Sequence, residues 1–254
     1  MSILDSFRLD GQVAVVTGGG RGIGEGIALA LAEAGADIVV AARRTAEIEA
    51  VAAKVRALGR RAMAVPTDVL DLAALEHLAA TTVAELGKLT IWVNNAGGAQ
   101  DRTMRSLGDT PEAAWDNQID LNLKAVWAGS NAAARTMAEG GVIVNISSVA
   151  GFKPSPVNGP YAIAKAGVNN LTMTLAAELA PRIRVVGVAP GPIPTEVMFE
   201  ATKLSEEQLH AMIGPSLPMK RLGTPADVAA AVVYLASPAA SWVTGATLSV
   251  SGGA

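Results

Sequence analysis

The sequence predicts an α/β fold in which a parallel, seven-stranded sheet is covered by helices on both faces. Three observations predict it. Short apolar runs alternate with longer stretches of helical period, the short runs are apolar throughout, as in strands buried on both faces, and glycines cluster after the first run. Right-handed crossovers between parallel strands would place helices over both faces of such a sheet.

The predicted elements follow in order along the chain. The strands are Val13 to Thr17, Asp37 to Ala41, Ala62 to Val65, Leu89 to Val93, Val142 to Ile146, Ile183 to Val188 and Thr247 to Val250. The helical stretches are Ile23 to Ala34, Ala46 to Leu58, Leu72 to Leu86, Asp116 to Glu139 and Tyr161 to Ala180. In the second helical stretch, Ile48, Val51 and Val55 fall on one face, at the spacing of a helix that packs on a sheet.

We expect residues 1–254 to form a single domain, because no linker, low-complexity tract or fixed-period repeat divides the chain. The exception to regular alternation is the segment from Pro190 to Thr224, which carries five of the 13 prolines around a polar stretch. A segment of this length between a strand and a helix is uncommon unless it has a function, such as that of a lid. We therefore expect a helical substrate flap at approximately 190–224.

Composition excludes several classes of function. The 254-residue chain is 50% hydrophobic and 17% charged, which argues against disorder, and its net charge of −3 gives no basis for nucleic-acid binding. It has no cysteine and two separate histidines, His77 and His210, so we expect no disulfide, thiolate chemistry or metal site. No apolar run reaches the roughly 18 residues of a membrane-spanning helix, and charges interrupt the N-terminal residues. We expect a cytoplasmic protein with no membrane partner.

The first predicted strand ends in a glycine-rich turn, Thr17-Gly18-Gly19-Gly20-Arg21-Gly22-Ile23-Gly24. Glycines allow positive φ and close approach of the backbone to a ligand, and the helix that follows presents free N–H groups. The spacing Gly18-x-x-x-Gly22-x-Gly24 is not the G-x-G-x-x-G fingerprint. A plain strand-to-helix turn stays open as an alternative, but the position after the first strand favours a dinucleotide site.

The end of the second predicted strand bears on the choice of dinucleotide. An acid at this place bonds the ribose hydroxyls and disfavours a 2′-phosphate. This chain has Ala42 there, followed by Arg43, with Arg21 in the glycine turn. Because paired guanidinium groups suit a phosphate dianion, we predict a preference for NADP(H), with NAD(H) possible. The alternative is that Arg43 and Arg44 are solvated surface charges.

A Ser, a Tyr and a Lys follow the fifth predicted strand in an order that suits proton transfer. Ser148 lies just beyond the strand, and Tyr161 and Lys165 share one face of the next helix. A nearby ammonium would lower the pKa of the phenol, and the Ser hydroxyl could hold a substrate oxygen beside it. Hydride would then pass between the substrate carbon and nicotinamide. A packed Tyr ring and a solvated Lys are the alternative.

Over essentially its whole length the chain resembles the classical short-chain dehydrogenase/reductase (SDR) family. The features that carry the resemblance, in the family's order, are the Thr17-Gly-x-x-x-Gly-x-Gly turn, Asp68-Val69, Asn94-Asn95-Ala96-Gly97, Asn122, Ser148, Tyr161-x-x-x-Lys165 and Pro190-Gly191. The resemblance implies a Rossmann-type, doubly wound domain and an enzyme that interconverts a secondary alcohol and a ketone with a nicotinamide cofactor.

The resemblance also implies roles for particular residues. Tyr161 would be the acid/base, Lys165 would lower its pKa and bind the nicotinamide ribose, and Ser148 would orient the substrate oxygen. Asn122 would hold a water between Lys165 and solvent, with a buried amide bonded to backbone as the alternative, and Ser147 is expected to be structural. The expected cofactor contacts are Gly18, Gly20, Arg21, Gly22, Ile23, Gly24, Arg43, Asp68, Val69, Asn95, Ala96, Gly97, Tyr161, Lys165, Pro190, Gly191, Ile193 and Thr195.

Some of these positions have plainer interpretations. Asp68 could be only a turn or cap residue, and residues 95–97 a simple turn after the fourth strand. The flap residues Val197, Met198, Phe199, Met212, Ile213 and Met219 could form an apolar pocket for a hydrophobic alcohol or ketone, or they could pack the flap's own helices.

The resemblance is greatest to the branch of 3-oxoacyl carrier-protein reductases and hydroxysteroid dehydrogenases. Carrier-protein enzymes have arginines where this chain has Glu139 and Ala177, which counts against an acidic carrier protein. By resemblance, the Ala-rich stretches Asp116 to Glu139 and Tyr161 to Ala180 form a dimer, and the last strand completes a homotetramer. The rival functions are a 3-oxoacyl-thioester reductase, a sugar-nucleotide epimerase, which the glycine spacing disfavours, and a non-catalytic redox sensor, which would not need the Ser, Tyr and Lys.

Overall fold

The computed structural model describes residues 2–99, 106–156 and 158–254. Its strands are β1 (Val13–Thr17), β2 (Asp37–Ala42), β3 (Ala62–Pro66), β4 (Ile91–Asn94), β5 (Gly141–Ile146), β6 (Ile183–Pro190) and β7 (Thr247–Val250). They form one sheet in the order β3-β2-β1-β4-β5-β6-β7, and every pair is parallel. The chain winds outward from β1 in one direction and from β4 in the other, so the predicted doubly wound parallel sheet is confirmed.

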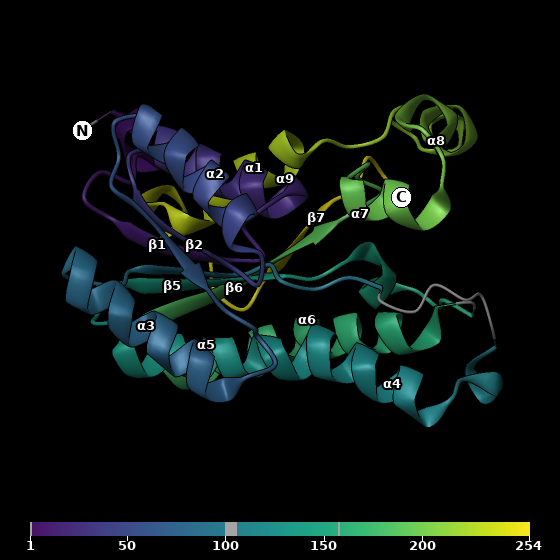
Figure 1. The fold of residues 1–254 in the computed structure, drawn as a ribbon, viewed down its shortest axis with the longest axis horizontal. Coiled ribbons are helices and arrows are strands. Elements are labelled where there is room, and N and C mark those ends of the chain that lie inside the picture. The colour runs from purple at the N-terminus through teal and green to yellow at the C-terminus, as the bar shows by residue number, and fades with distance from the viewer. Residues whose placement is uncertain (1, 100–105, 157) are drawn as a thin grey trace.

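Helices cover both faces of the sheet (Figure 1). One face carries α1 (Gly22–Glu33), α2 (Thr45–Ala57) and α9 (Pro225–Ala236), and the other carries α3 (Leu72–Leu86), α5 (Ala125–Thr136) and α6 (Gly159–Leu179). Among the described residues, no helix combines the length and the apolar character needed to cross a bilayer.

Strand β1 shows why the predicted strands contain runs of consecutive apolar residues. Ala14 and Val16 belong to the cluster beneath α1, α2 and α9, whereas Val13 and Val15 belong to the cluster beneath α3, α5 and α6. All four side chains are buried because both faces of the sheet are covered. The two clusters pack on opposite faces of the same sheet.

The helical stretch predicted at 116–139 is interrupted. Helix α4 (Glu112–Ile119) begins earlier than predicted and passes into a π-helical turn (Asp120–Lys124) before α5, which ends at Thr136. Within this turn the Ala125 N–H donates to the Asp120 carbonyl, five residues back. Such turns often occur at functional sites, and this one contains Asn122.

The segment between β6 and α9 is helical, as expected, with α7 (Glu196–Thr202) and α8 (Glu206–Ile213). Its interior is a small cluster of Leu209, Leu217 and Leu222, against which Met198, Phe199, Leu204 and Ile213 pack. Met212 and Met219 are 61% and 64% exposed, and the Val197 side chain lies outside the described part. The structure therefore favours packing of the flap's own helices over the expected apolar pocket at Met198, Phe199 and Ile213.

Candidate active site

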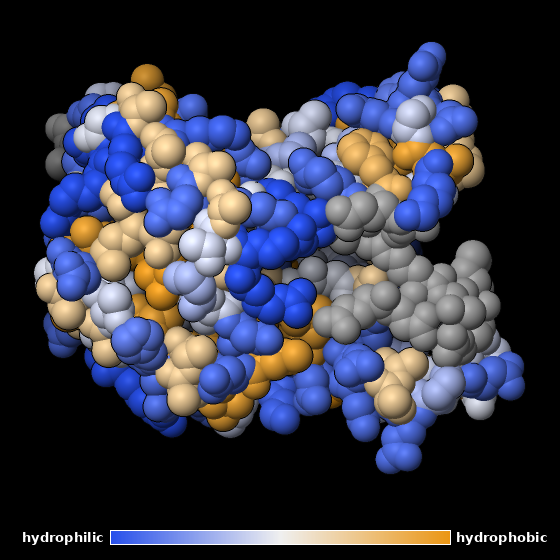
Figure 2. Space-filling model, viewed as in Figure 1, coloured by the Kyte–Doolittle hydropathy of each residue, from blue (hydrophilic) through white to orange (hydrophobic). Residues whose placement is uncertain are grey.

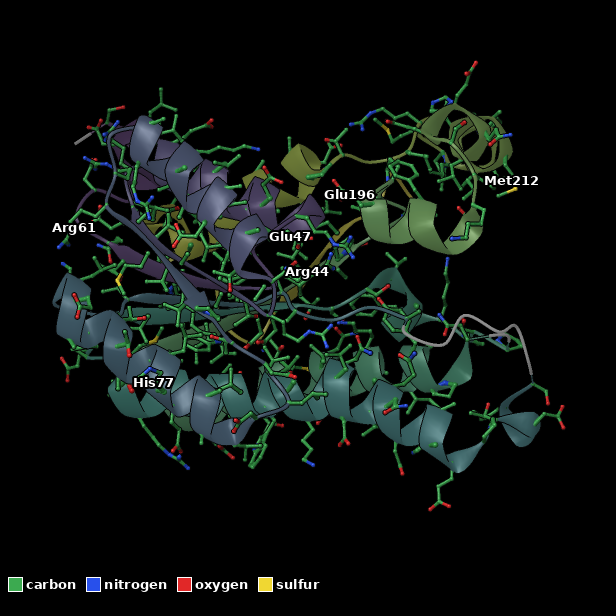
Figure 3. The ribbon with its side chains drawn as sticks, in the orientation of Figure 1. Arg44, Glu47, Arg61, His77, Glu196 and Met212 are labelled. Atoms are coloured by element: carbon green, nitrogen blue, oxygen red, sulfur yellow. The ribbon has the colours of Figure 1, made fainter. Side chains whose placement is uncertain are left out.

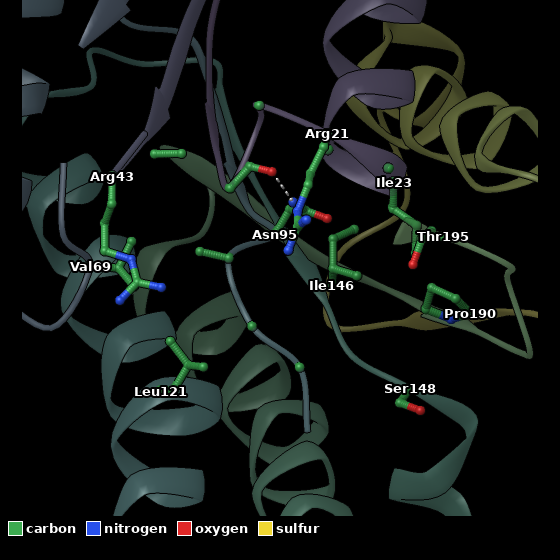
Figure 4. A pocket seen from close by; sticks show the side chains of 18 of the residues that line it. Arg21, Ile23, Arg43, Val69, Asn95, Leu121, Ile146, Ser148, Pro190 and Thr195 are labelled. Carbon is green, nitrogen blue, oxygen red and sulfur yellow. Dashed lines mark hydrogen bonds between the residues drawn. The ribbon is translucent and has the colours of Figure 1, made fainter. Parts of the chain in front are cut away.

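A pocket of about 350 Å³ lies at the carboxyl ends of the central strands, where the strand order reverses between β1 and β4 (Figure 4). Open parallel sheets bind ligands at this place. The predicted site residues on its wall are Gly18, Gly20, Arg21, Gly22, Ile23, Gly24, Arg43, Asp68, Val69, Asn95, Ala96, Gly97, Ser148, Tyr161, Lys165, Pro190, Gly191, Ile193 and Thr195. Asn122 is not on the wall.

The glycine turn connects β1 to α1 at one side of the pocket. Gly18 and Gly22 have φ values of 63° and 58°, and a Cβ on Gly24 would lie 2.2 Å from the Gly18 carbonyl oxygen. The backbone of the turn therefore leaves no room for a side chain at position 24. Arg21, the N-cap residue of α1, provides no side-chain hydrogen bond to the first turn. The N-terminus of α1 therefore fits a diphosphate, which would accept bonds from its N–H groups.

Asn95 ties the glycine turn to the loop after β4. Its Nδ2 donates to the carbonyl oxygens of Thr17 and Gly18 at 3.0 and 3.1 Å, and its backbone N–H donates to Thr17 Oγ1 at 3.1 Å (Figure 4). Because the side-chain amide is committed to the turn, Asn95 fixes the shape of the pocket rather than projecting into it. The loop that it anchors brings Ala96 and Gly97 to the wall.

Lys165 and Tyr161 lie at the opposite end of the pocket. Lys165 is 3% exposed, and its Nζ donates to the Ile146 carbonyl oxygen at 2.9 Å. The same Nζ lies 5.7 Å from the centroid of the Tyr161 ring. Burial lowers the pKa of Lys165 to about 8, because removal from water penalises the ammonium. An ammonium held beside a phenol in this way suits proton transfer.

Two serines follow β5 and differ in their surroundings. Ser148 caps a short 3-10 turn, Val149–Phe152, and its Oγ accepts a hydrogen bond from the Ala150 N–H at 3.2 Å. Its Oγ–H can still donate to a ligand, because an acceptor bond leaves the hydroxyl proton unused. Ser147 is buried and its Oγ donates to the Lys165 carbonyl at 3.1 Å, as the expected structural role requires.

Asn122 is fully buried in the π-helical turn and binds the loop that forms the pocket wall. Its Oδ1 accepts from the Gly98 N–H at 2.8 Å, and its Nδ2 donates to the Gly98 carbonyl at 3.1 Å and to Gln118 Oε1 at 2.9 Å. A Cβ on Gly97 would come within 2.9 Å of Asn122 Oδ1 and 3.4 Å of Lys165 Nζ. The amide is therefore bonded to backbone, and the water relay stays a prediction.

Charged side chains gather at the other end of the pocket. Hydrophilic residues cover the surface between α2 and α7, around the opening of the pocket (Figure 2). The charged residues on the pocket wall are Arg21, Arg43, Arg44 and Glu47, together with Asp68 and Lys165. Arg44 and Glu47 form an ion pair. Asp68 Oδ1 accepts a hydrogen bond from the Leu70 N–H at 3.0 Å. Asp68 therefore stabilises a turn, which was the alternative to a cofactor contact.

Several wall residues are not among the site residues predicted from the sequence: Ala42, Arg44, Glu47, Thr67, Leu70, Gly98, Leu121, Ile146 and Ser147. The Glu47 carboxylate reaches the wall because the first turn of α2 lies against the glycine turn. The ion pair of Arg44 and Glu47 could have been predicted from the sequence, because residues three apart lie on the same face of a helix. Within the described chain, no group of three or more His, Cys, Asp or Glu side chains could hold a metal.

Comparison with known proteins identifies the family. A protein-family model described as "Enoyl-(Acyl carrier protein) reductase" matches residues 18–254. The chain belongs to the SDR family. An uncharacterized oxidoreductase of Mycobacterium tuberculosis is 44% identical to this SDR protein, and the match covers 99% of the present chain and 95% of the relative. A 3-oxoacyl-[acyl-carrier-protein] reductase of Synechocystis is 39% identical over 96% and 97% of the two chains.

Solved structures agree. A 7α-hydroxysteroid dehydrogenase complexed with NADH and 7-oxo glycochenodeoxycholic acid superposes with a TM-score of 0.91, at 36% identity, over 100% of this chain and 98% of the other. A short-chain dehydrogenase of Burkholderia cenocepacia in complex with NADP gives a TM-score of 0.88 at 36% identity, over 97% and 98%. This SDR protein is thus an oxidoreductase of a family that binds nicotinamide cofactors and acts on small molecules.

Proposed function

We propose that this SDR enzyme transfers a hydride between NADP(H) and a secondary alcohol or ketone, with Tyr161 as the acid/base. One observation carries the proposal: the Lys165 ammonium is buried 5.7 Å from the Tyr161 ring centroid, in the pocket that also contains the glycine turn. A phenol supported by an ammonium, beside a nucleotide cradle, suits proton transfer coupled to hydride transfer.

The chain's own residues would supply orientation and the proton. Bound nicotinamide would supply or accept the hydride. Ser148 would hold the substrate oxygen, and Tyr161 would give it a proton during reduction or take one during oxidation. Lys165 would stabilise the phenolate, and its hydrogen bond to the Ile146 carbonyl oxygen fixes the ammonium for that task.

The charged end of the pocket supports NADP(H) over NAD(H). Ala42 offers no carboxylate to the ribose hydroxyls, and Arg43 lines the same pocket wall as Val69 (Figure 4). Relatives in this family are complexed with NADH in one structure and NADP in another, so the family alone does not decide. Kinetics with both cofactors test the preference. A preference for NAD(H) that Arg43→Ala leaves unchanged would contradict it.

Exposed apolar side chains near the catalytic end support a hydrophobic substrate. Phe152, which ends the turn that Ser148 begins, is 56% exposed. Leu107 is 47% exposed and lies against Gly159, two residues before Tyr161. Neither side chain lines the pocket wall, but exposed apolar groups so close in the chain or in space to Ser148 and Tyr161 support an apolar ligand.

A 3-oxoacyl-thioester reductase is the second candidate, because a relative at 39% identity carries that name. Glu139 and Ala177 are both exposed at the positions matched to carrier-binding arginines. A carboxylate there would repel an acidic carrier protein. Reduction of a free 3-oxoacyl thioester with no gain from an attached carrier protein would therefore fit this chain. A strong gain from the carrier would favour the second candidate.

The proposed assembly is a homotetramer. Trp127 on α5 and Ile163 and Met173 on α6 are 43%, 42% and 52% exposed, although all three are large apolar side chains. Trp242, just before β7, is 99% exposed. Apolar surface of this kind on the helices and on the sheet edge supports two interfaces with further copies. Light scattering that gives a monomer at micromolar concentration would contradict the proposal.

Replacement of Tyr161 tests the mechanism directly. Tyr161→Phe should lower ketone reduction about 100- to 10,000-fold and leave nucleotide binding intact, in a cofactor-linked screen of ketones, steroids and 3-oxoacyl thioesters. The chain offers a matched control in its second tyrosine, Tyr234, whose ring packs against Phe7; Tyr234→Phe should keep the activity. Unchanged reduction in Tyr161→Phe, or a wild-type protein that binds nucleotide and reduces nothing, would contradict the proposal and favour a sensor.

A further inference from the structure

An acidic side chain, Glu47, lines the nucleotide end of the pocket, although β2 ends in Ala42 and not in an acid. Arg44 is the N-cap residue of α2 and Glu47 lies in its first turn. The two side chains form an i, i+3 ion pair between Arg44 Nη1 and Glu47 Oε1. Figure 3 places this pair at the lower end of α2, where it meets the pocket, and both residues line the wall.

The Glu47 carboxylate lies between Arg44 and the glycine turn. A Cβ built on Gly20 would be 3.0 Å from Glu47 Cβ and 3.4 Å from Glu47 Oε2. One carboxylate oxygen therefore faces Arg44 and the other faces Gly20. The Glu47 side chain is 30% exposed and that of Arg44 is 57% exposed. Glu47 is thus the less solvated member of the ion pair. Its carboxylate lies close to the glycine turn, which we assign to nucleotide binding.

Arg43 differs from its neighbour. It lines the same wall, is exposed, and forms no hydrogen bond or ion pair with the residues that the structure describes. A 2′-phosphate could therefore bind Arg43 without displacing another group. To bind Arg44 as well, the phosphate would have to compete with Glu47 for the guanidinium, and it would also meet the like charge of the carboxylate. A nucleotide with a free 2′-hydroxyl meets neither obstacle.

We propose that Glu47 limits the preference of this pocket for 2′-phosphorylated nucleotides by holding Arg44 as its ion-pair partner. The inference rests on the proposed NADP(H) function and adds a specificity-determining residue to it. Arg43 attracts the 2′-phosphate. The Arg44–Glu47 ion pair determines how much further affinity for the phosphate Arg44 can contribute. The pocket is then selective for NADP(H) and still open to NAD(H).

Isothermal titration of two nucleotides that differ only in the phosphate tests the inference without any turnover. Adenosine 2′,5′-bisphosphate and adenosine 5′-monophosphate serve as probes for wild type and Glu47→Gln. The variant should bind the bisphosphate about three to ten times more tightly, the range that an exposed ion pair and a removed like charge can supply. Binding of the monophosphate should stay within about twofold, since the variant keeps the side-chain volume.

Two further variants separate this effect from general changes in charge. Glu49→Gln removes a carboxylate from the same helix, where Glu49 pairs with Arg56 and is absent from the pocket wall, and it should leave both affinities at the wild-type values. In the Arg44→Gln background, Glu47→Gln should lose its gain, because the guanidinium that it frees is missing.

Each contrary result has a distinct meaning. Weaker monophosphate binding in Glu47→Gln would mean that the carboxylate holds the ribose, and it would overturn the inference. So would equal gains in Glu47→Gln and Glu49→Gln, or a gain that persists without Arg44. If wild type binds neither nucleotide, the proposed function itself fails, whereas wild-type binding with an unresponsive Glu47→Gln overturns only the role of Glu47.

Discussion

The Lys165 ammonium lies 5.7 Å from the centre of the Tyr161 ring and donates a 2.9 Å hydrogen bond to the Ile146 carbonyl oxygen. The ammonium is buried, and among residues 2–99, 106–156 and 158–254 its position is fixed by the carbonyl of the last residue of β5 and by no carboxylate. Charge in such a place stabilises a neighbouring phenolate and costs folding free energy at the same time. Two predictions follow from this combination.

The first concerns pH. Burial lowers the pKa of Lys165 to about 8, so the ammonium is present below that pH and is lost as pH rises through it. The value of kcat/KM for ketone reduction should therefore fall as pH rises above about 8, since kcat/KM reports groups of the free enzyme. Initial rates at low substrate concentration across this pH range check it. A profile that stays level to pH 10 would contradict the assigned role of Lys165.

The second prediction concerns stability. The pKa of Lys165 is lower in the folded protein than in the unfolded chain, so its charge disfavours folding at neutral pH by about 3 kcal/mol, and this cost fades between pH 8 and about 10. Lys165→Met should abolish reduction and yet keep or raise the Tm at pH 7, with a smaller difference at pH 10. Thermal melts at both pH values measure this. A large drop in Tm at pH 7 would show that the lost bond to the Ile146 carbonyl outweighs the burial cost.

Gly24 provides a prediction for the nucleotide end. A Cβ there would lie 2.2 Å from the Gly18 carbonyl oxygen and 2.5 Å from Asn95 Nδ2, so Gly24→Ala must move the backbone of the glycine turn. We expect nucleotide affinity to fall at least about tenfold, since the turn carries the N–H donors. Gly108→Ala is the matched control, because its nearest neighbour, Ser106 Oγ, would be 4.0 Å away. Equal affinities in the two variants would remove the glycine turn from the site.

The sequence was sufficient to predict the sheet and most of the residues that line the pocket, for a physical reason. Strands buried on both faces contain runs of consecutive apolar residues, as Val13 to Val16 do in β1. Their carboxyl ends meet at one edge of the sheet, which brings the turn at Gly18 and the residues after β5 together. The π-helical turn at Asn122 left no such signal, because the stretch keeps its helical character through α4 and α5.

Two other features depend on how elements pack and not on their own sequence. Met198 and Phe199 are apolar whether they line a pocket or pack against Leu209, and only the folded flap distinguishes the two. Glu47 reads as an ordinary first-turn acid. It becomes part of the site because α2 places it against Gly20.

The last prediction concerns the point where the flap joins α9. Arg221 Nη1 and Nη2 donate to Asp227 Oδ2 and Oδ1 at 2.7 and 2.9 Å, and Thr224 forms a capping box with the same Asp. These bonds hold the pKa of Asp227 well below its usual range, with the Arg221 hydrogen bonds as the main cause. The ionised Asp227 therefore stabilises the fold above its unfolded pKa, near pH 4, and this contribution is lost progressively as pH falls below that value.

Asp227→Asn should lower the free energy of unfolding by about 1 kcal/mol at pH 7, the typical value of a helix cap. The difference from wild type should shrink on acidification, because below about pH 4 protons bind the Asp227 carboxyl of the unfolded wild-type chain and so favour unfolding. Urea unfolding of both proteins at pH 7 and at pH 3 measures it. The Arg8–Asp10 pair is an exposed control of like chemistry, with side chains 59% and 51% exposed, and Asp10→Asn should have a smaller effect. A difference for Asp227→Asn that is equal at both pH values would assign its effect to packing at the start of α9 rather than to the charge.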